Sequence, residues 1–128
     1  MKFESLGRHF LIEYYGCDLE AINDQDTVRE AMLEAARRGN ATIVADVFHL
    51  FNPHGISGVV VIAESHVAIH TWPEHRCVAI DIFSCSDKMI PELIEKYLKE
   101  AFKAQDVVIQ EIERGRVPLS ERPRSIES

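Results

Sequence analysis

The amino-acid sequence predicts an α+β fold: a mainly antiparallel sheet with two helices packed on one face, as a two-layer sandwich. Six β-rich segments and two amphipathic helical segments follow one another in the order β-α-β-β, then β-β-α-β. Each amphipathic helix needs an apolar face to cover, and a single sheet can provide it for both. The length of 128 residues suits one compact unit, so we expect a single domain over residues 1–128.

The first half is expected to contain a strand, a helix and two more strands. Residues 8–15 (RHFLIEYY) are aromatic and aliphatic, which is typical of a strand, and the polar residues 18–26 are expected to form a loop. Thr27 and Glu30 have the spacing of a capping box, and apolar residues then recur at helical spacing until Gly39, a plausible stop. Strands are expected at residues 42–51 and 58–63, with turn-forming residues between them.

The second half is expected to contain two strands, a helix and a last strand. Residues 67–72 and 76–83 alternate between apolar and polar, which predicts strands with one buried face. An apolar stripe from Ile90 to Phe102 predicts a helix, and Pro91 suits its first turn. Residues 107–112 read as the final strand, and the tail from Arg114 is expected to be loosely ordered. The sheet face without helices then needs solvent-tolerant residues or a partner.

Composition narrows the functional classes. The net charge of −7 argues against nucleic-acid binding, which requires a basic surface. The longest apolar run, residues 59–63, is too short to span a membrane. Residues 1–15 alternate apolar with polar and contain two glutamates, so we expect no signal peptide and a cytoplasmic location. The three cysteines lack CxxC spacing, so free thiols are expected.

Glu64, Ser65 and His66 lie between two expected strands, where a polar turn would be commonplace. A serine hydroxyl can also attack the carbonyl of the preceding residue when rigid strands hold the backbone under strain. The resulting ester breaks by β-elimination, and the new N-terminus becomes a pyruvoyl group with release of ammonia. The elimination needs a base, and His70 is near in sequence and suited to that role.

Two long motifs carry a family resemblance. Residues 55–74 (GISGVVVIAESHVAIHTWPE) and 79–85 (AIDIFSC) resemble segments of the small prokaryotic S-adenosylmethionine decarboxylases, and the similarity extends from about residue 5 to about residue 116. The resemblance implies cleavage between Glu64 and Ser65 into a beta chain, 1–64, and an alpha chain, 65–128. Ser65 would become the pyruvoyl group, with His70 as proton acceptor of processing, Ser57 assisting, and Cys85 as proton donor of decarboxylation.

The same resemblance implies the substrate and the assembly. The pyruvoyl carbonyl would form a Schiff base with S-adenosylmethionine, and its decarboxylated form would serve as the aminopropyl donor for spermidine. Phe51 and Glu74 match positions that line the substrate pocket. An aromatic ring suits a sulfonium or an adenine, and a carboxylate suits ribose hydroxyls. Small members of the family are dimers of the processed two-chain unit, with the active site at or near the subunit contact.

Other functions stay open at this point. One alternative keeps the pyruvoyl chemistry and decarboxylates a basic amino acid, arginine or ornithine. Another is a non-catalytic regulatory subunit, although the intact Ser65, His70 and Cys85 argue against it. A metal-binding or purely structural domain is a third. We expect no metal site, because no HExxH pattern links the clustered histidines, which are His49, His54, His66, His70 and His75.

Overall fold

A computed structural model describes residues 3–118 and contains one six-stranded sheet. The sheet order is β2-β3-β4-β5-β1-β6, and every neighbouring pair is antiparallel. In chain order the elements are β1 (Phe3–Tyr15), α1 (Leu19–Ile22), α2 (Gln25–Arg38), β2 (Ile43–Leu50), β3 (Ile56–Ile62), β4 (Ser65–Trp72), the 3₁₀ turn η1 (Pro73–His75), β5 (Cys77–Ser84), α3 (Pro91–Phe102) and β6 (Asp106–Pro118).

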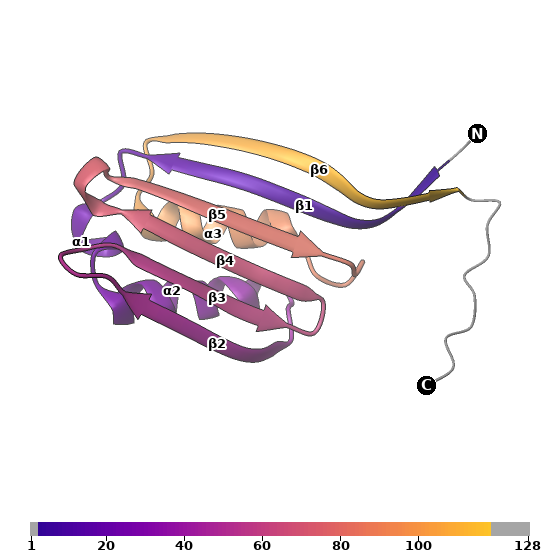
Figure 1. Cartoon of the computed structure of the whole chain (residues 1–128), viewed down its shortest axis with the longest axis horizontal. Coiled ribbons are helices and arrows are strands. Elements are labelled where there is room, and N and C mark those ends of the chain that lie inside the picture. The colour runs from indigo at the N-terminus through magenta and orange to yellow at the C-terminus, as the bar shows by residue number, and fades with distance from the viewer. Residues whose placement is uncertain (1–2, 119–128) are drawn as a thin grey trace.

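Both long helices lie on one side of the sheet, behind it in the view of Figure 1. Strand alternation explains why they pack there. On β1, Phe10, Ile12 and Tyr14 are buried, and their cross-strand partners on β5 are buried as well. The apolar stripe of α3 meets this face, and the Tyr14 hydroxyl donates a hydrogen bond to the Glu95 carbonyl oxygen at 2.8 Å. The predicted two-layer α+β architecture is therefore confirmed.

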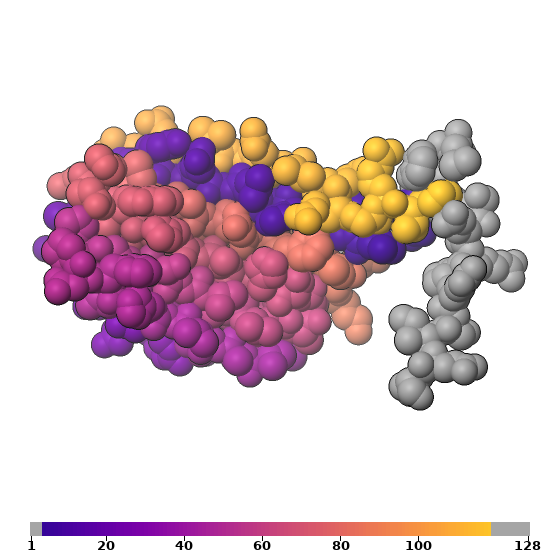
Figure 2. Space-filling model, viewed as in Figure 1, coloured from indigo at the N-terminus to yellow at the C-terminus, as the bar shows by residue number. Residues whose placement is uncertain are grey.

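Within residues 3–118, no helix covers the opposite sheet face, which we call the outer face (Figure 1). The space-filling view of the same side shows the atoms of this face (Figure 2). It carries the alternate side chains of every strand, and several of these are large and apolar. Val47 is 66% exposed and Trp72 is 40% exposed. An apolar sheet face left open in this way is typical of a surface that meets a partner.

The segment between β1 and α2 was expected to be a loop, and that prediction was wrong. It holds the short helix α1, and α2 begins at Gln25. Asp24, not Thr27, caps α2: its carboxylate accepts hydrogen bonds from the Thr27 backbone N–H at 2.9 Å and the Thr27 hydroxyl at 2.7 Å. An ionised carboxylate is a strong cap beside the positive end of a helix, so it displaces the capping box. The expected stop at Gly39 is confirmed.

The last strand runs further than the sequence suggested. β6 continues to Pro118 because its end pairs with the start of β1, where Glu4 faces Val117 and Ser5 faces Arg116. Residues 114–118 are therefore ordered strand, contrary to expectation, whereas the rest of the expected loose tail lies outside the described residues. Within residues 3–118, no helix has the length and apolar character needed to cross a membrane.

Candidate active site

A tight hairpin turn joins β3 to β4 and presents the Glu64–Ser65 peptide bond. Ile62 and Ser65 face each other across the hairpin, so Ala63 and Glu64 alone form the turn. Ser65 has φ of +153°, a region that favours glycine and strains other residues. Such a backbone costs on the order of 1–3 kcal/mol and persists only where the surroundings enforce it. The strain lies directly beside the bond that the resemblance marks for cleavage.

The surroundings of Glu64 supply that enforcement. Its carbonyl oxygen accepts a hydrogen bond from the Cys85 backbone N–H at 3.1 Å. Its carboxylate Oε1 accepts from the Thr42 backbone N–H at 3.0 Å, and this bond holds the pKa of Glu64 below its usual value. The carbonyl and the side chain of Glu64 are thus fixed from two different segments.

The Ser65 hydroxyl and the Cys85 thiol belong to the same end of the sheet. Ser65 pairs with Ser84, which places Cys85 just beyond the end of β5 beside the turn. The Ser65 Oγ lies 3.3 Å from Nδ1 of His66, and Cys85 is an exposed, free thiol. Glu64, Ser65 and Cys85 form what we call the cleavage cluster.

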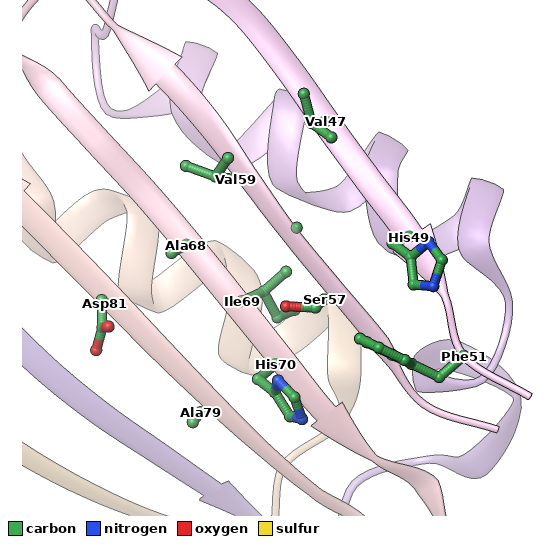
Figure 3. A pocket seen from close by; sticks show the side chains of 11 residues that line it. Val47, His49, Phe51, Ser57, Val59, Ala68, Ile69, His70, Ala79 and Asp81 are labelled. Atoms are coloured by element: carbon green, nitrogen blue, oxygen red, sulfur yellow. The ribbon is translucent and has the colours of Figure 1, made fainter.

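A second group of predicted residues lies at the other end of β4, on the outer face. His70 stands directly opposite Ser57 on β3, and the Phe51 and His70 rings have centroids 6.2 Å apart. All three line an open hollow of about 550 Å³ that Asp81 also borders (Figure 3). We call Phe51, Ser57 and His70 the pocket cluster. Apart from Asp81, the walls of the hollow are mostly apolar or aromatic.

Glu74 lies beyond this hollow, in η1 just after β4. Its Oε2 is 2.8 Å from Nε2 of His54, which belongs to the turn between β2 and β3. The pKa of the Glu74 carboxyl lies below its usual range. The main cause is a hydrogen bond from its own backbone N–H, and the hydrogen bond to His54 adds to it. A hollow lined by His54, Glu74 and Arg76 opens beside this pair.

The two clusters do not meet within one chain. Ser65 and His70 occupy the two ends of β4, and five residues of strand at about 3.3 Å per residue separate them by roughly 16 Å. Proton transfer requires hydrogen-bond distance, so His70 cannot reach Ser65 of its own chain in this arrangement. The sequence analysis named Ser65, His70 and Cys85 together as catalytic residues, and within one chain the structure places His70 apart from the other two.

Three contacts at these ends were not anticipated from the sequence. His66 was visible as the neighbour of Ser65, but nothing in the sequence indicated that its ring meets the hydroxyl. The Thr42 bond to Glu64 and the His54 bond to Glu74 span 22 and 20 residues, so no local pattern reports them. Among residues 3–118, no three His, Cys, Asp or Glu side chains form a group that could hold a metal ion.

Comparisons with known proteins give a consistent result. The family model described as S-adenosylmethionine decarboxylase matches residues 8–115. The S-adenosylmethionine decarboxylase proenzyme of Acidithiobacillus ferrooxidans is 51% identical over 90% of this chain and 86% of its own length. The proenzyme of the same name from Moorella thermoacetica is 52% identical over 87% of this chain and 89% of its own length. The crystal structure of the adenosylmethionine decarboxylase from Aquifex aeolicus matches with a TM-score of 0.86 at 32% identity, covering 94% of this chain and 99% of that one.

Proposed function

This chain belongs to the S-adenosylmethionine decarboxylase family, and from that premise we propose that it makes its own catalytic carbonyl by cutting the bond between Glu64 and Ser65. The chain is an S-adenosylmethionine decarboxylase proenzyme. Its product fits the role of aminopropyl donor in spermidine synthesis. The observation that carries the processing proposal is the strained Ser65 backbone beside a Glu64 carbonyl that already accepts a hydrogen bond.

The first step is an acyl shift from nitrogen to oxygen. The Ser65 hydroxyl attacks the Glu64 carbonyl carbon, the C–N bond breaks, and an ester replaces the amide with no atom gained or lost. Negative charge develops on the Glu64 carbonyl oxygen during the attack, and the Cys85 N–H is positioned to stabilise it. Release of the strain at Ser65 favours the same step.

The second step is β-elimination. A base removes the Ser65 α-proton, the ester C–O bond breaks, and residue 64 leaves as the carboxylate end of chain 1–64. The dehydroalanine left on chain 65–128 tautomerises and takes up water, which releases ammonia and leaves a pyruvoyl group. We assign the base to His70, assisted by Ser57, which stands opposite it on β3.

Because His70 lies too far from Ser65 of its own chain, we assign the processing site to a homodimer. A second copy with its outer face against the first, and with its strands running the opposite way, would bring His70 of the partner subunit toward Ser65. The exposed apolar side chains of the outer face, such as Val47 and Trp72, support docking of this kind. Such a dimer has two equivalent sites, each made from one cleavage cluster and one pocket cluster.

In the mature enzyme, the pyruvoyl carbonyl supplies the electron sink for loss of carbon dioxide. We assign the remaining work to side chains of both clusters. Phe51 contacts the sulfonium or the adenine, and Glu74 accepts hydrogen bonds from the ribose hydroxyls. Cys85, exposed at the cleavage cluster, returns a proton to the substrate carbon. The relatives are named for S-adenosylmethionine, which favours it over arginine or ornithine.

An intact mass spectrum of the purified protein tests the processing. Cleavage before Ser65 divides the 128 residues into fragments 1–64 and 65–128, which are equal in length. A gel would not separate two fragments of such similar size well, but mass spectrometry does. The fragment 65–128 should be lighter by one ammonia than its serine-started form. A single species near 14.6 kDa that persists through prolonged incubation would contradict self-cleavage.

A further inference from the structure

We propose that His54 is a positioning residue: it holds the Glu74 carboxylate in the orientation that accepts hydrogen bonds from the ribose hydroxyls of the substrate. The inference rests on the proposed function, because that function assigns Glu74 to the substrate. His54 Nε2 lies 2.8 Å from Glu74 Oε2, which is within the usual range for a hydrogen bond between a ring nitrogen and a carboxylate. The two residues come from different turns, 20 positions apart in the chain.

The turn that carries His54 is itself fixed. The Phe51 backbone N–H donates to the Gly55 carbonyl oxygen at 2.8 Å and closes the loop around residues 52–54. Gly55 has φ of +107°, a backbone conformation that would be strained in a residue with a side chain. Phe51 and His54 therefore belong to one closed turn, so the residue assigned to the sulfonium or adenine and the residue that holds Glu74 are placed together.

The exposed carboxylate of Glu74 needs a hydrogen-bond partner to fix its orientation. The side chains of His54 and Glu74 are 37% and 41% exposed, and an unheld carboxylate at that exposure samples several rotamers. Ordering it on substrate binding would weaken affinity, and a bond already present in the free protein removes that cost. His54 contacts one oxygen, and an ionised carboxylate has further acceptor sites for a hydroxyl.

Among the described residues, His54 is the basic side chain within hydrogen-bond distance of the Glu74 carboxylate. Arg76 lines the same hollow, yet the described residues show no bond between it and Glu74. His75 is adjacent to Glu74 in sequence, but among the described residues it has no hydrogen bond or ion pair with that carboxylate. The lowered pKa of Glu74 agrees with a carboxylate that stays ionised and able to accept.

Steady-state kinetics of three variants with S-adenosylmethionine tests the role. His54→Ala should raise KM about tenfold while kcat stays within about twofold, because the bond acts on binding and not on the reacting atoms. His54→Gln should restore most of the affinity, since its amide N–H can donate to the same oxygen. His75→Ala is the matched control and should leave both constants nearly unchanged. Mass spectra of each variant report whether it has cleaved and so whether it has folded.

A double-mutant cycle separates positioning from a general structural effect. In a Glu74→Ala background, His54→Ala should add nothing to KM, because the side chain that it positions is gone. Additive effects of the two changes would overturn the inference. If Glu74→Ala raises KM and His54→Ala does not, the inference fails while the proposed function stands. If Glu74→Ala itself leaves KM unchanged, the assignment of Glu74 to the substrate fails first.

Discussion

The two ends of β4 differ in what fixes them. At the Ser65 end, backbone groups dominate: a strained φ, a carbonyl held by the Cys85 N–H and a carboxylate held by the Thr42 N–H. At the His70 end, side chains dominate: rings face an open hollow, and Phe51 is 43% exposed.

This difference agrees with the different tasks that we propose for the two ends. Bond cleavage within the chain needs a backbone that is already distorted and polarised, and hydrogen bonds within the sheet can provide that. Recognition of a separate molecule needs an accessible cavity with aromatic and polar side chains. Under the proposed function, each end lacks what the other supplies, and the two half-sites of one chain are completed in a dimer.

The largest effect is expected at the cleavage end. Ser65→Ala removes the attacking hydroxyl and the source of the pyruvoyl group, so both cleavage and decarboxylation should be lost completely. The intact mass and a carbon dioxide release assay measure the two outcomes. Full turnover by the Ser65→Ala protein would rule out the pyruvoyl mechanism.

The separation of the ends predicts complementation between two inactive variants. Ser65→Ala and His70→Ala should each be inactive alone. In a mixed dimer, one site combines the intact Ser65 of one chain with the intact His70 of the other. If the two chains pair at random, half of the dimers are mixed. Each mixed dimer has one working site of two, so about a quarter of the wild-type activity should return.

Mass spectrometry of co-expressed, differently tagged chains checks this prediction. The His70→Ala chain should be the one that is cleaved. Ser65→Ala with Cys85→Ala is the control pair for decarboxylation: both residues belong to the same cluster of one chain, so mixing restores no site with both groups, and carbon dioxide release should stay low although the Cys85→Ala chain is cleaved. Purified mixed dimers in which the His70→Ala chain stays intact would place the whole site within one chain.

Cys85→Ala should separate the two reactions at the cleavage end. The backbone N–H that contacts the Glu64 carbonyl remains, so cleavage should continue. Loss of the proton donor should lower kcat by about 10²-fold or more, which is typical when general acid catalysis is removed. The ratio of cleaved fraction to kcat is the measurement, and equal loss of both would show that the thiol itself takes part in processing.

The smallest effect is expected at the pocket end. Phe51→Ala removes an aromatic face that is worth about 0.5–2 kcal/mol to a bound cation, so KM should rise by about two- to thirtyfold. Leu50→Ala is a matched control, since Leu50 is also exposed but pairs with Ile56 and so points away from the outer face. An unchanged KM for the Phe51 variant would remove Phe51 from the substrate site.

Periodicity alone predicted most of the fold. Alternation on β4 and β5 placed Val67, Ile69 and Ile80 on the buried face, and the structure confirms it. Failures occurred where two local signals competed, as at Asp24 and Thr27, or where pairing extended an element, as at the end of β6. Cross-strand pairing depends on residues more than 100 positions away, such as Glu4 and Val117, and a local window does not contain them.

The sequence by itself indicated the family and the set of candidate residues, because those are carried by residue types in long, specific motifs. Only the tertiary structure decided how the residues are distributed. The antiparallel register placed Ser57 opposite His70 at one end of β4. It placed Cys85 beside Glu64 at the other end of the same strand. Residues that are close in sequence can be far apart in an extended strand, since each step advances the chain by about 3.3 Å.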